Sequence, residues 1–415
     1  MQRFTHGWIG ASAAALTLFT LIALPLWLKK PPADDFAGSA ITQRAFPSLT
    51  YGIQGFFWWD SGQTGVQMDW VRMMSFSHIK QTFAWRDLEA DKGVWDFSQS
   101  DRILDEAERR GLRTIARLGQ TPDWFSGRDT QTAAQLLESE DDDIPPKSEQ
   151  DFEDWANYCT TVATRYKGRI AAYQIWNEPN LSREWGGKPP DAAGYTRLLA
   201  ACSTAIRAVD SDAILISAGL SPTGDNNAQA TPDDVYLDAM YRAGFQQYID
   251  VVGVHAPGFS APEMGPDDLE RAGSHRFFAF RRPEDLRKIM IAHGDAARQM
   301  AILEMGWTTE TQGDPAYSWF AVSEEQQAEY LVQAFDYIHE HWSPWVGLVS
   351  VIYLPKPSWT EADEEYWWAI SEPNFRARPA FAALVAMPKW CDDTYIPARI
   401  DNTEEGIFAT LDTCP

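Results

Sequence analysis

The sequence predicts a (β/α)8 barrel, in which eight parallel strands alternate with helices along the chain. Three observations lead to this fold class: eight apolar runs, segments of helical character between them, and no glycine-rich phosphate loop after the first run. Strands that are apolar throughout indicate a parallel sheet covered by helices on both faces. A doubly wound open sheet is the alternative, but that fold does not need eight such units.

The predicted strands are short, and the segments between them are long enough for helices. One such segment, "SEEQQAEYLVQAFDYIHEHW", begins with Ser323, a favourable N-cap residue. The eight strands are expected at residues 49–57, 78–85, 113–119, 170–176, 213–219, 249–255, 300–306 and 348–354.

An uninterrupted apolar segment without charge, residues 8–28, precedes the barrel. It is long enough to cross a bilayer, and two lysines and two prolines follow it where a signal peptide would have a small-residue cleavage site. We therefore expect an uncleaved signal anchor; a cleaved signal peptide is the alternative. The predicted organisation is a transmembrane anchor at 1–30, a linker at 31–45, the barrel at 46–390 and a C-terminal tail at 391–415.

The chain is acidic, with a formal net charge of −24. This charge excludes nucleic acid or anionic lipid as a partner held by general electrostatics, and it suits a neutral substrate. The longest break between strands, residues 121–150, contains an acidic run, Glu138 to Asp143, which we expect to be a solvated loop over the substrate-binding rim.

The chain has four cysteines, at spacings that do not suggest a zinc site. Cys159 and Cys202 fall on consecutive predicted helices and either pair or remain buried thiols. Cys391 and Cys414 bracket the tail and are candidates for a clamp. With few histidines and no ligand spacing, the sequence implies no metal and no cofactor.

Two glutamates end apolar strands that face each other across the predicted barrel mouth. Glu178 follows the fourth strand in "AAYQIWNEPN", and Glu304 ends the seventh in "AILEMGWTT". Charged residues are rarely left in apolar strands without a partner or a task, although Glu178 alone also fits a solvated turn. Cleavage of a glycosidic bond requires two carboxyl groups, one protonated and one ionised, facing each other across a cleft.

These motifs resemble those of retaining glycoside hydrolases on (β/α)8 barrels, and most closely glycoside hydrolase family 39 and its relatives, which include β-xylosidases and endoglycosidases acting on bacterial exopolysaccharides. "YQIWNEPN" resembles the acid/base motif and "ILEMGWTT" the nucleophile motif. Further likenesses cover most of the body, in "GLRTIARLGQTPDW", "RYKGRIAAYQIWNEPN" and "AISEPNFRARPAFAAL".

The resemblance implies roles for individual residues. Glu178 would be the general acid/base and Glu304 the nucleophile, while Asn177 would hydrogen-bond the sugar 2-hydroxyl. Arg86 would support the ionised nucleophile. The aromatic candidates are Trp359, expected to form the floor of the central sugar site, and Trp124 and Trp307, each of which either stacks on a sugar or packs at the rim.

The sixth strand departs from the family pattern. Relatives often show His-x-Tyr, whereas this chain has His255-Ala256-Pro257, so the histidine matches and the tyrosine does not. Tyr353 is one candidate for the missing hydroxyl. His255 itself is either a substrate-site residue or a structural histidine at the barrel end.

The expected function is retaining hydrolysis of an oligo- or polysaccharide by double displacement. An inactive carbohydrate-binding protein on the same barrel and a transglycosylase with the same residues are the alternatives. A hydrolase of polymeric sugars is useful outside the cytoplasm, so we expect the barrel on the outer side of a membrane. The sequence leaves open the sugar, the linkage, exo or endo action and the oligomeric state.

Overall fold

The structure is a computed structural model that describes residues 41–59, 62–125, 143–310, 318–391, 394–396, 400–403 and 406–409. These residues belong to one compact unit that extends from Ser39 to Pro415. The segment predicted to anchor the chain in a membrane, residues 8–28, lies outside them. Among the residues that the structure does describe, no helix combines the length and apolarity that a bilayer span requires.

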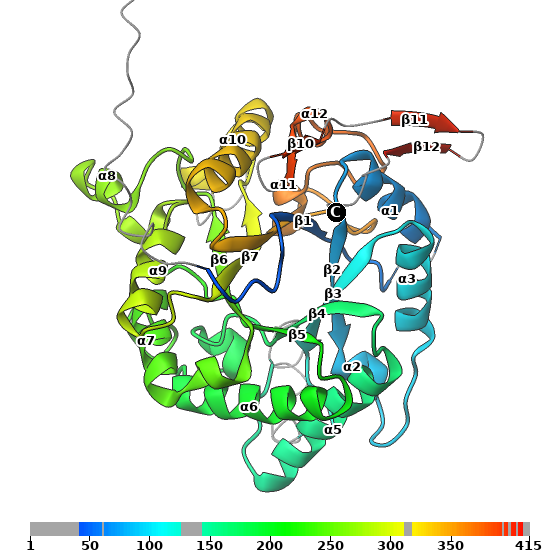
Figure 1. The fold of residues 1–415 in the computed structure, drawn as a ribbon, viewed down its shortest axis with the longest axis vertical. Coiled ribbons are helices and arrows are strands. Elements are labelled where there is room, and N and C mark those ends of the chain that lie inside the picture. Colours follow the sequence, from blue (N-terminus) through cyan, green and yellow to red (C-terminus); the bar gives the residue numbers. More distant parts are fainter. Residues whose placement is uncertain are drawn as a thin grey trace, which may run out of the picture. The chain divides into compact units, whose positions relative to one another are not determined.

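Eight parallel strands close into a barrel in sequence order, with β1 paired to β8, which confirms the predicted fold class (Figure 1). Every predicted strand is present. The strands are β1 (Thr50–Gln54), β2 (His78–Ala84), β3 (Arg113–Gly119), β4 (Ile170–Ile175), β5 (Ile214–Ser217), β6 (Val251–Pro257), β7 (Gln299–Gly306) and β8 (Val346–Val351).

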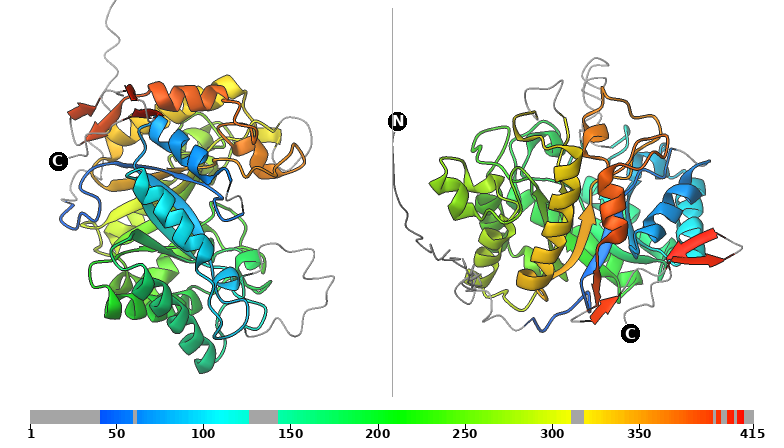
Figure 2. Two further views of the ribbon diagram at one scale, coloured as in Figure 1. Left: turned by 90° about the vertical axis from the view of Figure 1, so that its right-hand side faces the viewer. Right: turned by 90° about the horizontal axis from the view of Figure 1, so that it is seen from above.

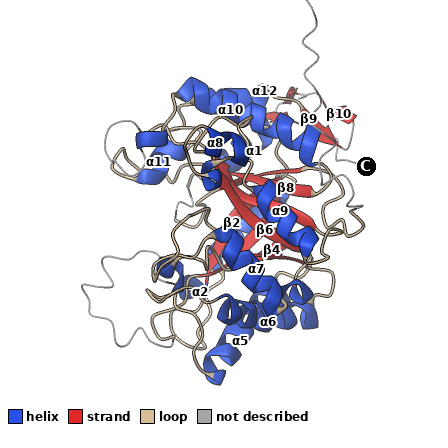
Figure 3. Cartoon of the chain, turned by 90° about the vertical axis from the view of Figure 1, so that its left-hand side faces the viewer, coloured by secondary structure: helices blue, strands red, loops and turns tan. Residues whose placement is uncertain are grey.

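A ring of helices surrounds the strands, one main helix after each strand, as the views from other sides also show (Figure 2, Figure 3). Ser323 caps its helix as predicted, because its side chain accepts a hydrogen bond from the Gln326 N–H. The main helices are α1 (Thr64–Met73), α3 (Ser98–Arg109), α5 (Glu149–Arg165), α6 (Ala192–Val209), α7 (Asp233–Ala243), α9 (Pro283–Ala292), α10 (Glu324–Tyr337) and α12 (Pro379–Ala386).

Shorter elements lie in the connections and in the tail. The single-turn elements are α2 (Trp85–Leu88), η2 (Ser182–Trp185), η3 (Phe245–Tyr248), α8 (Pro266–Arg271), η4 (Arg276–Phe278), η5 (Ser318–Phe320), η6 (Ile338–Trp342) and α11 (Glu364–Trp368). The tail contains two hairpins, formed by β9 (Lys389–Cys391) with β10 (Thr394–Ile396) and by β11 (Ile400–Thr403) with β12 (Gly406–Ala409).

Of the two cysteine pairs considered, Cys159 on α5 and Cys202 on α6 form a disulfide. This bond links neighbouring helices of the outer ring and closes a loop of 43 residues, which restricts the unfolded chain. Cys414 lies outside the described residues, so the clamp on the tail stays a prediction, as do the predicted domain boundaries.

The barrel interior is apolar at its N-terminal end and polar towards its C-terminal end. Its apolar layer includes Ile115, Ala172, Ile216, Ala301 and Leu348. Above this layer the strand register turns polar side chains inward, because positions two residues apart share a face. These inward polar residues are Gln54, Lys80, Arg117, Gln174, His255, Glu304 and Ser350. The polar layer is the floor of the barrel mouth.

Candidate active site

Glu178 leaves β4 in a strained turn that directs its side chain into the mouth. Trp176 and Glu178 both have positive φ, 72° and 34°, which is uncommon for residues with a Cβ. Asn180 holds the turn, since its side chain accepts from the Ser221 N–H and donates to the carbonyls of Ser221 and Thr231. The surrounding structure therefore maintains a backbone conformation that residues 176–180 would not adopt alone.

Glu304 reaches the mouth because β7 contains a bulge. Val254 of β6 pairs with Ile302, but the next residue, His255, pairs with Glu304, so Leu303 is an extra residue in β7. A bulge of this kind re-aims the side chains that follow it, and it occurs often next to active sites. Here it brings Glu304 beside His255.

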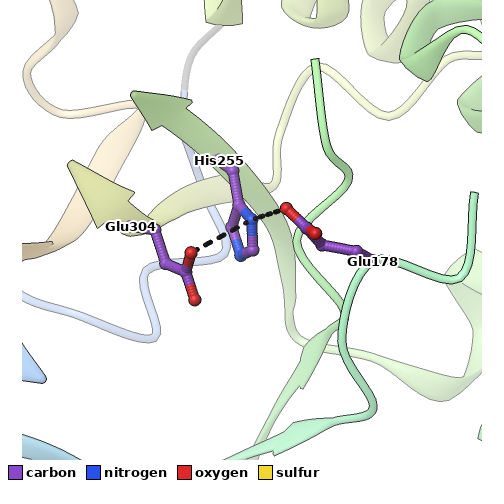
Figure 4. Close-up of side chains that lie close together, drawn as sticks. All are labelled: Glu178, His255 and Glu304. Carbon is purple, nitrogen blue, oxygen red and sulfur yellow. Dashed lines mark hydrogen bonds and ion pairs between the residues drawn. The ribbon is translucent and has the colours of Figure 1, made fainter. Parts of the chain in front are cut away.

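His255 lies between the two glutamates, as Figure 4 shows. Its Nδ1 is 2.9 Å from Glu178 Oε1 and 3.6 Å from Glu304 Oε2, and its side chain is buried. One oxygen of each carboxylate and a ring nitrogen all lie within 4.8 Å of one another. His255 thus contacts both carboxylates, and its contact with a substrate stays a prediction.

Gly219, which follows β5, leaves the space that the His255 ring occupies. A Cβ at Gly219 would lie 2.1 Å from His255 Cδ2 and 2.2 Å from its Nε2. The Gly219 carbonyl also accepts a hydrogen bond from the Glu178 N–H, at 3.0 Å. Gly219 thus positions both the histidine and the turn that holds Glu178.

We expect Gly219→Ala to lower kcat/KM by about 10²-fold, because misplacing a catalytic group by about 1 Å has an effect of that size. Steady-state kinetics would measure it, and circular dichroism would check that the variant folds. Gly52→Ala is the matched control, since a Cβ there meets its nearest neighbour, the Val349 carbonyl, at an ordinary 3.4 Å. Equal activity of both variants would show that the His255 contact is dispensable.

A buried lysine on β2 holds Glu304 from below. Lys80 Nζ is 3.2 Å from Glu304 Oε1 and donates at 3.0 Å to the carbonyl of Leu303, the bulge residue. Its side chain is 1% exposed. Lys80 therefore places a positive charge on the carboxylate and donates to the carbonyl of the bulged residue.

Burial alone would raise the pKa of both glutamates, but nearby groups reverse this. For Glu178, the hydrogen bond from His255 and the charge of Arg183 lower the pKa below its ordinary value. For Glu304, the charges of His255 and Lys80 lower the pKa, against an opposing contribution from Glu178. Both carboxyls are thus held ionised in the resting site.

The other residues predicted for the site fall into two groups. Asn177 is buried and lies beside Glu178; its side chain donates to Glu184 and accepts from Gln174. Trp359 packs edge-on against Phe56 and Tyr353. These contacts orient groups that the sequence predicted to face the sugar.

Three further predicted residues make contacts outside the Glu178–Glu304 pair. Arg86 is half-buried on α2, and Lys80 is a cation bonded to Glu304, so the support of Glu304 by Arg86 stays a prediction. Trp124 packs edge-on against Trp85 and donates to the Glu89 carbonyl. Trp307 is fully buried and donates to the Ser260 carbonyl, so it has no face open to a sugar and takes the packing alternative.

The acidic loop also requires a correction. Asp143, the last residue of the acidic run, is buried and accepts a hydrogen bond from the Thr121 N–H at 2.9 Å, so the prediction of a solvated residue is wrong there. The others in the run, residues 138–142, lie outside the described part of the chain.

Tyr353 lies close enough to the pair to be affected by it. Burial raises the pKa of its phenol well above the ordinary value, and the negative charge of Glu304 adds to the increase. Tyr353 therefore stays the candidate for the hydroxyl that the sixth strand lacks.

Two charged residues near the site, Lys80 and Arg117, were not predicted, although the sequence contains a signal for both. Lys80 in "HIKQTFAW" and Arg117 in "RTIARLG" are charges inside apolar strands, the same anomaly that singled out the glutamates. Arg117 lies 3.9 Å from Glu184, which in turn holds Asn177. Gly219 has no such signal, because its importance depends on which side chain lies opposite.

Among the described residues, Glu178, His255 and Glu304 form the one group of side chains spaced to hold a metal ion. Lys80 already places a positive charge on Glu304, and Arg183 places another on Glu178, at 2.7 Å. A divalent cation would be repelled by both. The charge arrangement therefore suits acid–base and nucleophilic chemistry better than metal binding.

Comparison with known proteins confirms the resemblance over part of the chain. Residues 63–225, which include Glu178, match the model of glycosyl hydrolases family 39. Endo-1,4-beta-xylanase C of Phanerodontia chrysosporium is 30% identical over 99 residues, which are 23% of this chain and 21% of that protein. The match thus spans about a fifth of the length of that xylanase.

Solved structures share the fold at low sequence identity. A family 39 glycoside hydrolase from Bacteroides cellulosilyticus superposes with a TM-score of 0.58 at 18% identity, over 84% of this chain and 66% of that one. Xylanase 10B of Thermotoga petrophila, solved with xylobiose, gives a TM-score of 0.53 at 15% identity, over 82% and 94%. At these identities the comparison shows the barrel fold.

Proposed function

We propose that this chain is a retaining glycoside hydrolase that cleaves O-glycosidic bonds of an oligo- or polysaccharide. The observation that carries the proposal is the approach of Glu178 and Glu304, which have oxygens within 4.8 Å of each other. Retaining enzymes hold their two carboxyl groups about 5–5.5 Å apart, whereas inverting enzymes need roughly 6.5–9.5 Å to admit a water. The family match around Glu178 supports the same chemistry.

In the proposed reaction, Glu304 attacks the anomeric carbon while Glu178 gives its proton to the departing glycosidic oxygen. Glu178 then removes a proton from water, and the resulting hydroxide displaces Glu304 from the sugar with a second inversion. Lys80 and His255 keep Glu304 ionised for the attack. Glu178 must gain a proton first, and a bound sugar favours this by displacing water from its carboxylate.

A panel of aryl glycosides and bacterial polysaccharides, with release of reducing ends as the readout, tests hydrolysis. NMR of the first product tests retention, because the released sugar should keep the anomeric configuration of the substrate. Glu178→Ala tests the acid/base role in the same assay. Glu325→Ala, a change at an exposed position on α10, is its matched control. Initial release of the opposite anomer would refute retention, and no cleavage of any substrate would favour an inactive carbohydrate-binding protein.

Arg183 provides a pH test of the acid/base role. It lies on η2 with its side chain 60% exposed, and its Nη2 is 2.7 Å from Glu178 Oε2. Its removal takes away a charge that lowers the pKa of Glu178. A higher pKa keeps Glu178 protonated to higher pH, so Arg183→Ala should move the basic limb of the kcat/KM profile upward.

Arg197→Ala is the control for this measurement, because Arg197 is also exposed and paired with a glutamate, Glu149, on the outer helices. A basic limb that stays in place in Arg183→Ala, or moves equally in both variants, would argue that Glu178 is not the proton donor.

We also propose that residues 8–28 anchor the chain in a membrane, with the barrel on the outer side. The length of the uncharged apolar segment supports this placement. Fusion of alkaline phosphatase or a cytoplasm-active reporter at residue 45 distinguishes the two sides. Activity of the cytoplasmic reporter alone would overturn the outer placement.

A further inference from the structure

We propose that an aromatic platform beside the barrel mouth binds a further sugar ring of the substrate, so that the preferred substrate is a saccharide chain of several units. The inference rests on the proposed function and names its substrate class. The platform consists of Phe259, Phe277, Phe278, Trp319 and Phe320.

The platform is built on the strands that carry His255 and Glu304. Phe259 lies just beyond β6, where the Gly258 N–H donates at 2.7 Å to the carbonyl of Gly306, at the end of β7. Trp319 and Phe320 belong to η5, in the connection that leaves β7. The platform is thus a continuation of the rim from which the two side chains project.

Packing connects the platform to the mouth. Phe320 is buried against Ile352 and Trp368, and both Phe259 and Tyr353 pack on this cluster. Tyr353 in turn contacts Trp359, predicted to floor the central sugar site, with ring centroids 5.7 Å apart. Packed apolar and aromatic side chains therefore connect Trp359 with Trp319.

Buried Trp307 holds the platform loop in place. A Cβ at Gly258 would lie 1.8 Å from the Trp307 ring, so the chain passes so near the ring that a residue with a Cβ would clash. Trp307 also donates to the Ser260 carbonyl, at 2.9 Å. The residue predicted as a sugar contact thus fixes the loop that carries Phe259.

Trp319 presents the open face of the platform, with 55% of its surface exposed. Its ring is fixed by Phe278 and Phe320, each with a centroid 4.8 Å away, and by Phe259, nearly parallel at 6.2 Å. A large apolar side chain left exposed on a rigid support indicates a binding surface. Because the ring is already ordered, a ligand loses little side-chain freedom by stacking on it.

The surroundings favour a sugar as occupant. A sugar ring combines an apolar face with a hydroxyl edge, and it suits an aromatic surface bordered by polar groups. The exposed ring of His275 stacks on Phe277 at 5.2 Å and borders the platform. Next to it, Arg276 pairs with Asp285 and Glu270, so charged groups interrupt the apolar area that a stable protein interface would need.

The test measures binding of xylohexaose, mannohexaose and cellohexaose, and of their disaccharides, to full-length Glu304→Gln, which should bind without turnover. Isothermal titration calorimetry gives the affinities in this background, alone and with Trp319→Ala or Trp319→Phe added. We expect Trp319→Ala to weaken the hexasaccharide that binds by about tenfold and its disaccharide by less than about threefold. Trp319→Phe should recover part of the loss.

Val235→Ala, a change at an exposed apolar residue on α7, is the control and should leave the affinities unchanged. The platform proposal is overturned if Trp319→Ala weakens binding of hexasaccharide and disaccharide equally, or weakens neither. It is also overturned if no hexasaccharide binds. Sedimentation of the same samples tests whether a second copy of the chain covers the platform. A dimer that Trp319→Ala dissociates would show this and would also overturn the proposal. Hydrolysis of aryl monoglycosides tests the proposed function independently.

Discussion

Replacement of Glu304 by alanine should reduce kcat by about 10⁴-fold or more on any substrate that the protein cleaves, because it removes the carboxylate proposed to form the covalent intermediate. Azide should then restore turnover of an aryl glycoside with a good leaving group. The small anion fits the space of the lost carboxylate and attacks the same face of the sugar. The product should be a glycosyl azide of inverted configuration, identified by NMR.

Glu178→Ala provides the contrast that assigns the two roles. Without the acid/base, azide acts after the glycosyl-enzyme forms, so its product should have retained configuration. Glu325→Ala should keep wild-type activity. A glycosyl azide of retained configuration from Glu304→Ala, or unchanged activity in that variant, would show that Glu304 is not the nucleophile.

Replacement of Lys80 by methionine should lower kcat/KM by about 10²–10³-fold, the range that follows removal of one preorganised charge-stabilising donor. The loss should come with a change in pH dependence. Lys80 is one of the cations that lower the pKa of Glu304, so its removal raises that pKa. Glu304 is then ionised only at higher pH, and the acid limb of the kcat/KM profile moves upward.

The ammonium group of Lys80 is mostly charged at neutral pH. Burial lowers the pKa of its ammonium group to about 8, although the charge of Glu304 partly opposes this, so the group remains mostly protonated at pH 7. Lys288→Met, at a half-exposed lysine on α9, is the matched control. An acid limb at the wild-type position in Lys80→Met would mean that the lysine only supports the bulge.

The strands were predictable because each shows its character locally. A run such as "MAILEMG" has to be buried on both faces, and eight runs of this kind leave few arrangements other than a closed parallel barrel. Helix starts were predictable for the same reason, as Ser323 shows, because a cap depends on neighbours within one turn. The two glutamates stood out as charges at the ends of such runs.

The partners of the glutamates were not predictable in this way. Lys80 and His255 contact Glu304 from strands that lie more than 200 and about 50 residues away, and the bulge at Leu303 decides that they meet. The sequence left Trp307 between stacking on a sugar and packing at the rim, and the loop that crosses its ring leaves it buried. Such outcomes depend on which side chain lies opposite which, and sequence spacing does not contain that information.

By itself, therefore, the sequence determined the barrel and the two glutamates, because apolar periodicity and buried charge are properties of short segments. Only the tertiary structure decided that His255 bridges the pair, that Lys80 is bonded to Glu304 and that Gly219 leaves the space for the His255 ring. The physical reason is that close packing in the barrel sets these distances to within fractions of an ångström. One bulged residue or one missing Cβ is enough to determine them.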